Sequence, residues 1–156
     1  MIIRFSVLCC FIVLFLGFIE NAHAQDNWWK DKKYSTETVK AKYQLCKGTF
    51  KEIGQGFTYR NINNINKYFG DQVYLNIISN EKGYYSPTQA ELILVDFMDY
   101  FTVSSFNYKR SSRYNTYAFA VGKYVYKLSG NKRELDILVS LKYYGDAWMI
   151  DQVTIN

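Results

Sequence analysis

Alternation of apolar and polar residues near the C-terminus predicts three consecutive antiparallel strands over Tyr114–Ile155. The middle strand carries its apolar side chains on one parity: Leu135, Ile137, Val139, Leu141 and Tyr143. Successive side chains of a strand point to opposite faces, so this pattern is typical of a strand with one buried face. Two glycine-containing pairs mark the turns between the strands: Gly130-Asn131 and Gly145-Asp146.

The last of these strands changes parity along its length. Trp148 and Ile150 are apolar at even positions, whereas Val153 and Ile155 are apolar at odd positions. One extra residue in a strand of an antiparallel pair shifts the parity without ending the strand. We therefore expect a β-bulge near Asp151.

Upstream, apolar residues recur at helical spacing. A helix is predicted to follow Thr36, and its buried stripe is formed by Val39, Tyr43, Cys46, Phe50, Ile53 and Phe57. Gly54 and Gly56 are expected to loosen or end this helix. A shorter helix is predicted from Asn61 to Gly70, with Ile62, Ile65 and Phe69 on its apolar side, followed by a strand over Gln72–Ile78.

A capping box marks the start of another helix. Ser86 stands at the N-cap, Pro87 at the first helical position and Gln89 three residues after the cap. The helix is expected to reach Phe101, with a buried stripe of Ala90, Ile93, Leu94, Phe97 and Phe101. The flanking segments are interpreted as a loop over Asn80–Tyr85, a strand over Ser104–Arg110 and a turn over Ser111–Arg113. This order of elements predicts an α+β fold, with N-terminal helices packed on one face of a curved antiparallel sheet.

The N-terminus has the pattern of a secretory signal peptide over residues 1–24. Arg4 precedes the apolar segment Phe5–Ile19, and Ala22-His23-Ala24 fits a cleavage site. The apolar segment is shorter than the about 20 residues that a membrane-spanning helix needs. We expect cleavage before Gln25 and export to the periplasm or the medium, without stable membrane insertion. Residues 25–35 are then a lead-in, and residues 36–156 a single domain.

Charge and residue inventory exclude several classes of function. The net charge is +5 and the lysines are scattered, which favours a solvated surface and no nucleic-acid partner. The only histidine, His23, lies in the signal segment, and Cys46 is the only cysteine after it. Metal sites and nucleophilic triads draw on clustered His and Cys side chains. We therefore expect no disulfide, no metal site and no cofactor.

Several local motifs, in order, carry a resemblance to a known family. They are Ile65-Asn66-Lys67-Tyr68-Phe69, Val73–Ile78, Tyr85–Leu94, Asp96-Phe97, Tyr117–Tyr124 and Trp148-Met149-Ile150. With these motifs the chain resembles the Bacteroidetes family called domain of unknown function 4783. The resemblance implies a nuclear transport factor 2-like cone and a small exported protein of unassigned function. It supplies no catalytic residue.

Aromatic residues are unusually frequent, with 15 Tyr and 3 Trp. Such residues suit pleated surfaces and a packed core, which is one interpretation. The other interpretation is that some of them line a cavity in the cone for a small apolar or planar ligand. The candidates for that cavity are Tyr43, Phe69, Phe97, Phe101, Tyr117, Phe119, Tyr124 and Trp148.

Three classes of function stay open. The first is a non-enzymatic module that binds a small apolar ligand. The second is a protein–protein interaction module, for example a homodimer formed through the sheet. The third is an enzyme similar to ketosteroid isomerase, which needs an Asp base and a Tyr or protonated Asp donor in an apolar pocket. The acids nearest the apolar stripes are Asp96, Asp99, Asp136 and Asp151, and their patterns favour exposed positions.

Overall fold

The computed structural model describes residues 37–78 and 81–156. The predicted signal peptide and the predicted lead-in over residues 25–35 lie outside the described residues. The chain divides into two compact units, residues 1–42 and residues 43–156. Only residues 37–42 of the first unit are described, and they form the opening turns of helix α2. The second unit carries the features discussed below.

The helices are α2 (Glu37–Tyr59), the single turn α3 (Asn63–Asn66) and α4 (Pro87–Tyr100). The predicted stripe of α2 is confirmed for Cys46, Phe50, Ile53 and Phe57, which are buried. In α4, the Ser86 side chain accepts a hydrogen bond from the Gln89 N–H, and the Gln89 side chain accepts one from the Ser86 N–H. This reciprocal pair confirms the predicted capping box and fixes where α4 begins.

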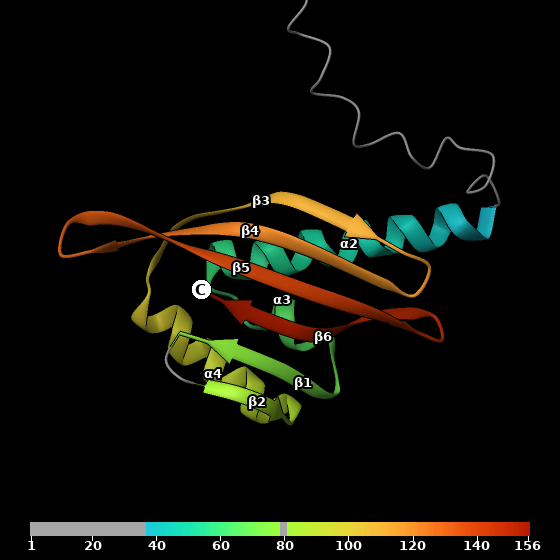
Figure 1. Cartoon of the computed structure of the whole chain (residues 1–156), viewed down its shortest axis with the longest axis horizontal. Helices are drawn as coiled ribbons and strands as arrows, with labels where there is room; N and C mark the ends of the chain where they lie inside the picture. Colours follow the sequence, from blue (N-terminus) through green and yellow to red (C-terminus); the bar gives the residue numbers. More distant parts are fainter. Residues whose placement is uncertain (1–36, 79–80) are drawn as a thin grey trace, which may run out of the picture. The chain divides into compact units, whose positions relative to one another are not determined.

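The strands form one six-stranded sheet in the order β2-β1-β6-β5-β4-β3 (Figure 1). Their bounds are β1 Phe69–Ile77, β2 Glu81–Tyr85, β3 Val103–Arg113, β4 Tyr117–Leu128, β5 Asn131–Tyr144 and β6 Ala147–Ile155. The α+β prediction is confirmed. The sheet is mixed, however, because β1 pairs with β6 in parallel while every other pairing is antiparallel.

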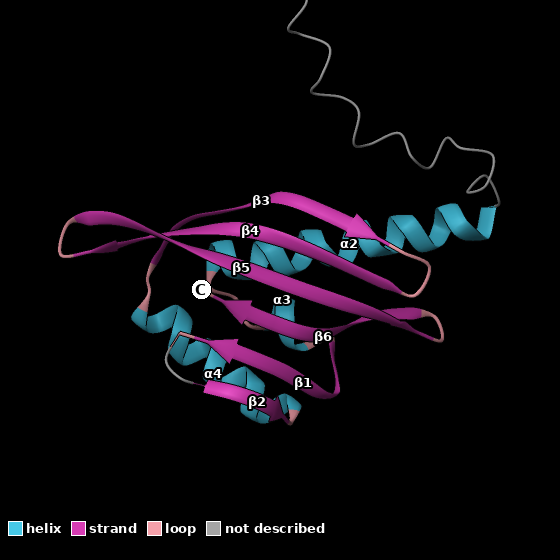
Figure 2. Cartoon of the chain, in the orientation of Figure 1, coloured by secondary structure: helices cyan, strands magenta, loops and turns pink. Residues whose placement is uncertain are grey.

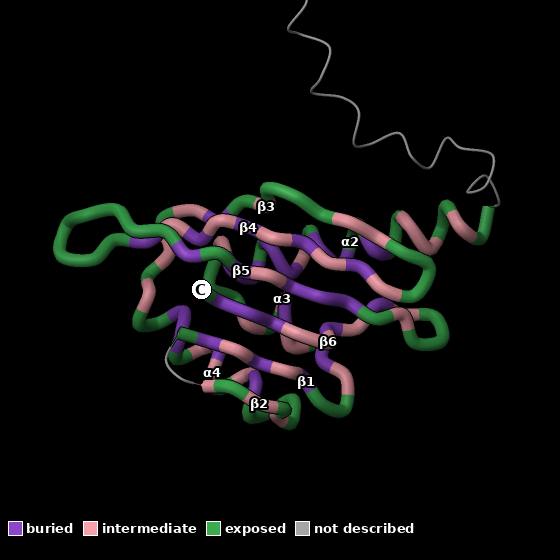
Figure 3. Tube along the Cα trace, in the orientation of Figure 1, coloured by how far each residue is buried: buried purple, intermediate pink, exposed green. Residues whose placement is uncertain are grey.

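The predicted bulge in β6 is confirmed. Ser140 pairs with Gln152 and Leu141 pairs with Ile150, which leaves Asp151 as the extra residue. The bulge keeps Trp148 and Ile150 on the same buried face as Val153 and Ile155. In Figure 3 the buried positions therefore continue along β5 and β6, while the tip of the β4–β5 hairpin is exposed.

Other boundaries differ from the sequence predictions (Figure 2). The segment expected as a loop forms strand β2 from Glu81 onward, antiparallel to β1. Phe69 and Gly70 belong to β1 rather than to the preceding helix, and β3 continues through Arg113 instead of turning at Ser111. In each case pairing with a neighbouring strand supplies the backbone hydrogen bonds, which local sequence preference does not reveal.

The turn between β4 and β5 lies one residue earlier than predicted. Leu128 pairs with Asn131, so the two loop residues are Ser129 and Gly130, with φ values of 50° and 80°. Two positive φ angles in a two-residue loop match the right-handed twist of the flanking strands. The other predicted turn, Gly145-Asp146, is confirmed between Tyr144 and Ala147.

Helix α2 does not end at its glycines as expected. Gly54 and Gly56 are buried inside the helix, which continues to Tyr59. A Cβ atom at Gly54 would lie 3.0 Å from the Tyr108 ring, and one at Gly56 would lie 2.5 Å from the Ile65 side chain. These glycines therefore allow close packing of α2 rather than termination.

Candidate functional site

Aromatic side chains pack together between the helices and one face of the sheet, which we call the inner face. Phe57 from α2 and Phe97 from α4 both contact Tyr124 on β4, with ring centroids 6.4 and 5.3 Å away. Phe106 from β3 lies 5.3 Å from Phe57. Phe57 and Tyr124 are 0% exposed, while Phe97 is 5% and Phe106 6% exposed. This part of the interior is therefore occupied by the protein's own side chains.

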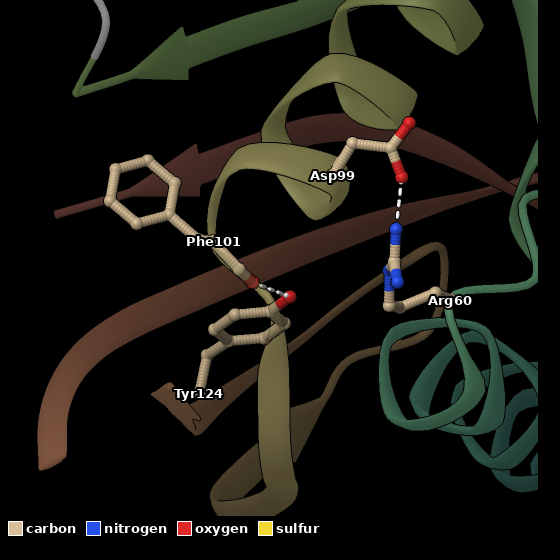
Figure 4. A network of polar contacts seen from close by, with 4 residues as sticks. All are labelled: Arg60, Asp99, Phe101 and Tyr124. Carbon is tan, nitrogen blue, oxygen red and sulfur yellow. Dashed lines mark hydrogen bonds and ion pairs between the residues drawn. The ribbon is translucent and has the colours of Figure 1, made fainter. Parts of the chain in front are cut away.

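The hydroxyl of Tyr124 is already engaged (Figure 4). It donates a hydrogen bond to the backbone carbonyl of Phe101 at 2.6 Å. Burial raises the pKa of Tyr124 to about 12, against a smaller lowering effect of the Arg60 charge. A tyrosine held in this way stays protonated at neutral pH and ties β4 to the end of α4.

Beside it, Arg60 and Asp99 form an ion pair that connects the end of α2 to α4 (Figure 4). Both side chains are partly exposed, at 38% and 62%. Exposed pairs of this kind contribute about 0–1 kcal/mol to stability. The pair therefore connects the two helices but adds little to stability.

The four acids considered for catalysis do not join the aromatic interior. Asp99 pairs with Arg60, Asp136 with Lys123, and Asp151 with Lys142. Asp96 is exposed on α4. None of these four carboxylates therefore lies among the buried rings of the described residues, where isomerase-like chemistry would place its Asp base.

The structure brings together only some of the candidate cavity residues. Phe97, Phe101 and Tyr124 lie in one cluster, where Phe97 and Phe101 are 5.2 Å apart. Trp148 is buried against Tyr143, Phe69 pairs with Ile150 between β1 and β6, and Tyr43 lies under the Arg113 guanidinium. These three belong to other parts of the packed unit.

Tyr117 and Phe119 cannot line the same cavity as Tyr124. On β4 the inner face carries Ala118, Ala120, Gly122 and Tyr124, all buried. The odd-numbered residues point to the opposite face because side chains alternate along a strand. The alternation of residues along β4 in the sequence already indicated that Tyr117 and Phe119 lie on the face opposite to Tyr124. The ligand-binding role of the remaining candidates stays a prediction.

A groove of about 530 Å³ lies beside α4, next to the aromatic cluster. It is lined by Ile78, Glu81, Ile93, Asp96, Phe97, Tyr100 and Phe101. Two of these, Phe97 and Phe101, were among the predicted cavity residues. Glu81 and Tyr100 were not predicted as lining residues, because the pattern around Glu81 is typical of a loop and Tyr100 lies outside the predicted stripe of α4.

The face of the sheet opposite α2 and α4, which we call the outer face, carries a second group of apolar side chains. Its half-buried members are Tyr74, Tyr117, Phe119, Val121, Val125, Leu138 and Met149. At its centre the hydroxyls of Tyr117 and Ser140 form a 2.9 Å hydrogen bond. Two ion pairs, Lys123–Asp136 and Lys142–Asp151, flank this centre.

The described residues contain no group of three or more His, Cys, Asp or Glu side chains placed to hold a metal ion. They also contain no helix with the length and apolar character needed to cross a membrane.

The fold defines the class of protein. Solved structures with the same arrangement include an NTF2-like protein of unknown function from Cytophaga hutchinsonii. That protein is 16% identical, with 69% of this chain and 95% of that chain covered and a TM-score of 0.53. The protein thus has an NTF2-like α+β fold, which confirms the fold predicted from the sequence.

Within this class the chain belongs to the family described as Domain of unknown function (DUF4783), which matches residues 50–156. Solved members resemble it in fold. One from Bacteroides ovatus is 19% identical, covering 66% of this chain and 89% of that chain, with a TM-score of 0.59. One from Bacteroides uniformis is 23% identical, covering 68% and 94%, with a TM-score of 0.60. No curated protein matches the chain. The family predicted from the motifs is confirmed.

Proposed function

We propose that the protein is an exported, non-enzymatic interaction module that associates with a second copy of itself through the outer face of its sheet. One observation carries this proposal. The inner face is covered by α2 and α4 and filled with aromatic side chains, whereas the half-buried apolar side chains of the outer face are covered by no described helix. Aromatic and apolar surfaces of this kind are enriched at the centres of protein interfaces.

The charges of the outer face favour a second copy as the partner. A net charge of +5 opposes self-association at most surfaces. The outer face is different, because Lys123 and Lys142, which flank its centre, pair there with Glu134, Asp136 and Asp151. Two cations and three anions on one patch can pair with the same patch related by a two-fold axis.

The test is the oligomeric state of the chain that starts at Gln25, measured by light scattering and native mass spectrometry. We expect a dimer that becomes a monomer in Phe119→Lys, because the substitution places a charge in the middle of the apolar patch. Leu92→Lys is the matched control, since Leu92 is 61% exposed on α4 and away from this face. A monomeric wild-type chain, or a dimeric Phe119→Lys variant with native circular dichroism, would contradict the proposal.

Export is part of the same proposal and has its own test. The apolar segment before Ala22-His23-Ala24 supports cleavage after Ala24. Intact-mass measurement of the exported protein should then give a chain that begins at Gln25. A membrane-bound species that retains Met1 would contradict export.

A second candidate function is the binding of a small ligand in the groove beside α4. The observation in its favour is the combination of a volume of about 530 Å³ with the aromatic side chains of Phe97, Tyr100 and Phe101. Sites for small molecules typically have volumes of about 300–1,000 Å³ and mostly apolar walls. Native mass spectrometry of protein purified from its own host would show a retained molecule alongside the subunit count.

A further inference from the structure

The groove beside α4 combines an aromatic wall with two carboxylates, Glu81 and Asp96. We propose that it binds a small organic cation, an amine or quaternary ammonium carried on an apolar body. This inference rests on the ligand-binding candidate above and names the chemical class of its ligand. It is independent of self-association through the outer face.

The aromatic wall suits a cation as well as an apolar group. Phe101 lies between Phe97 and Tyr100, with ring centroids 5.2 and 4.7 Å away, and it meets Tyr100 edge-on at 73°. Tyr100 is 75% exposed, so its ring is open to a ligand. The face of an aromatic ring attracts a cation within about 6 Å of its centroid. Rings set at an angle to one another therefore offer a cation more than one face.

The carboxylates of the groove lack the partners that the neighbouring acids have. Neither Glu81 nor Asp96 forms an ion pair with any residue of the described segments, whereas Asp99, one turn further along α4, pairs with Arg60. The Tyr85 hydroxyl donates to Oε2 of Glu81 at 2.8 Å. This hydrogen bond holds the Glu81 carboxylate in place without neutralising its charge.

The charges of Glu81 and Asp96 determine which ligand charge the groove favours. The chain as a whole carries a net charge of +5, so two carboxylates without an ion-pair partner in the described segments form a local negative site beside the aromatic rings. An anionic ligand would be repelled here, and a neutral apolar ligand would leave the carboxylates without a partner. An apolar cation satisfies both parts of the lining, because its body contacts Phe97 and Phe101 while its charge faces Glu81 and Asp96.

The test uses three probes with one apolar body and different charges: phenylbutylamine, phenylbutanol and phenylbutyrate. Binding to the chain that starts at Gln25 is followed by NMR chemical-shift changes at Ile93, Tyr100 and Phe101. We expect the amine to bind about tenfold more tightly than the alcohol, because two exposed charge pairs contribute up to about fivefold each. We expect the acid to bind more weakly than the alcohol. Raising the salt concentration should weaken only the amine.

Charge-removing variants locate the effect. Glu81→Gln and Asp96→Asn together should bring the affinity for the amine down to that for the alcohol, and glutamine keeps an acceptor for the Tyr85 hydroxyl. Asp99→Asn is the matched control, because Asp99 is on the same helix but does not line the groove. It should leave the amine affinity unchanged.

The outcomes separate the two proposals. If the alcohol binds as tightly as the amine with shifts in the groove, the ligand-binding function stands and the cation preference is wrong. If the acid binds more tightly than the amine with shifts in the groove, the cation preference is likewise wrong while the ligand-binding function stands. If none of the three probes shifts the groove residues, both the ligand-binding function and the cation preference fail. Equal loss of amine binding in Asp99→Asn and in the double variant would place the cation outside the groove and overturn the inference.

Discussion

Two glycines of helix α2 are predicted to respond in opposite ways to the same substitution. A Cβ atom at Gly48 would meet nothing within 4 Å, whereas one at Gly56 would lie 2.5 Å from Cγ1 of Ile65 and 3.1 Å from the carbonyl oxygen of Asn61. Ile65 is 0% exposed, and the backbone carbonyl has little freedom to move. Gly48→Ala thus adds a methyl group to α2 in open space. Gly56→Ala adds the same group to the same helix in space that the Ile65 side chain already occupies.

The magnitudes follow from helix propensity and packing. Alanine in a helix interior is favoured over glycine by about 1 kcal/mol, so Gly48→Ala should stabilise the protein by about that amount. At Gly56 the same gain is opposed by an overpacking cost of about 1–3 kcal/mol. The Gly56→Ala variant is therefore expected to be less stable than Gly48→Ala by about 1–3 kcal/mol, and less stable than the wild type by up to about 2 kcal/mol.

Urea unfolding followed by circular dichroism measures this difference. With a slope of about 2 kcal/mol per molar urea, the two midpoints should differ by roughly 0.5–1.5 M. Ile65→Ala provides the internal control, because removing the obstructing side chain should reduce the penalty of Ala at position 56 in the double variant. If Gly56→Ala stabilises as much as Gly48→Ala, the close packing of α2 on Ile65 is wrong.

Further predictions concern single buried groups. Tyr108→Phe should stabilise the protein by about 1 kcal/mol in urea melts, because the buried Tyr108 hydroxyl has no hydrogen-bond partner in the described part of the chain; a loss of stability would reveal a partner. Burial raises the pKa of the Cys46 thiol to about 12, despite a smaller opposing effect of Arg113, so a thiol-reactive dye should label the folded protein slowly at neutral pH. In the unfolded chain the pKa of the Cys46 thiol is near its ordinary value of 9.0. The free energy of unfolding should therefore fall between about pH 9 and 12, by up to about 1.4 kcal/mol per pH unit. Cys46→Ala should reduce that slope. Phe97→Ala should cost about 3–5 kcal/mol and the exposed neighbour Asp96→Ala less than about 0.5 kcal/mol; equal shifts of the two urea midpoints would show that the buried face of α4 is assigned wrongly.

Local sequence determined the features that depend on neighbours along the chain. The capping box of Ser86 and Gln89 placed the start of α4, because all the groups it needs lie within four residues. The change of parity between Ile150 and Val153 placed the bulge at Asp151, because one apolar face had to be kept across the strand. The alternation of β4 likewise separates Phe119 from Tyr124, although the candidate cavity combined them.

The tertiary structure alone decided the features that depend on distant partners. Strand β2 has no apolar alternation, and Glu81–Tyr85 is a strand because β1 offers unpaired backbone groups beside it. The parallel pairing of β1 with β6 brings together residues such as Leu75 and Val153, and no local pattern encodes that choice. The groove also depends on distant partners. Glu81 lines it together with Asp96 and Phe101 because β2 pairs with β1 and α4 packs beside these strands. Contacts between residues far apart in the sequence depend on the combined burial of many side chains. The local pattern therefore indicates which residues are buried, while the folded chain determines which residues they contact.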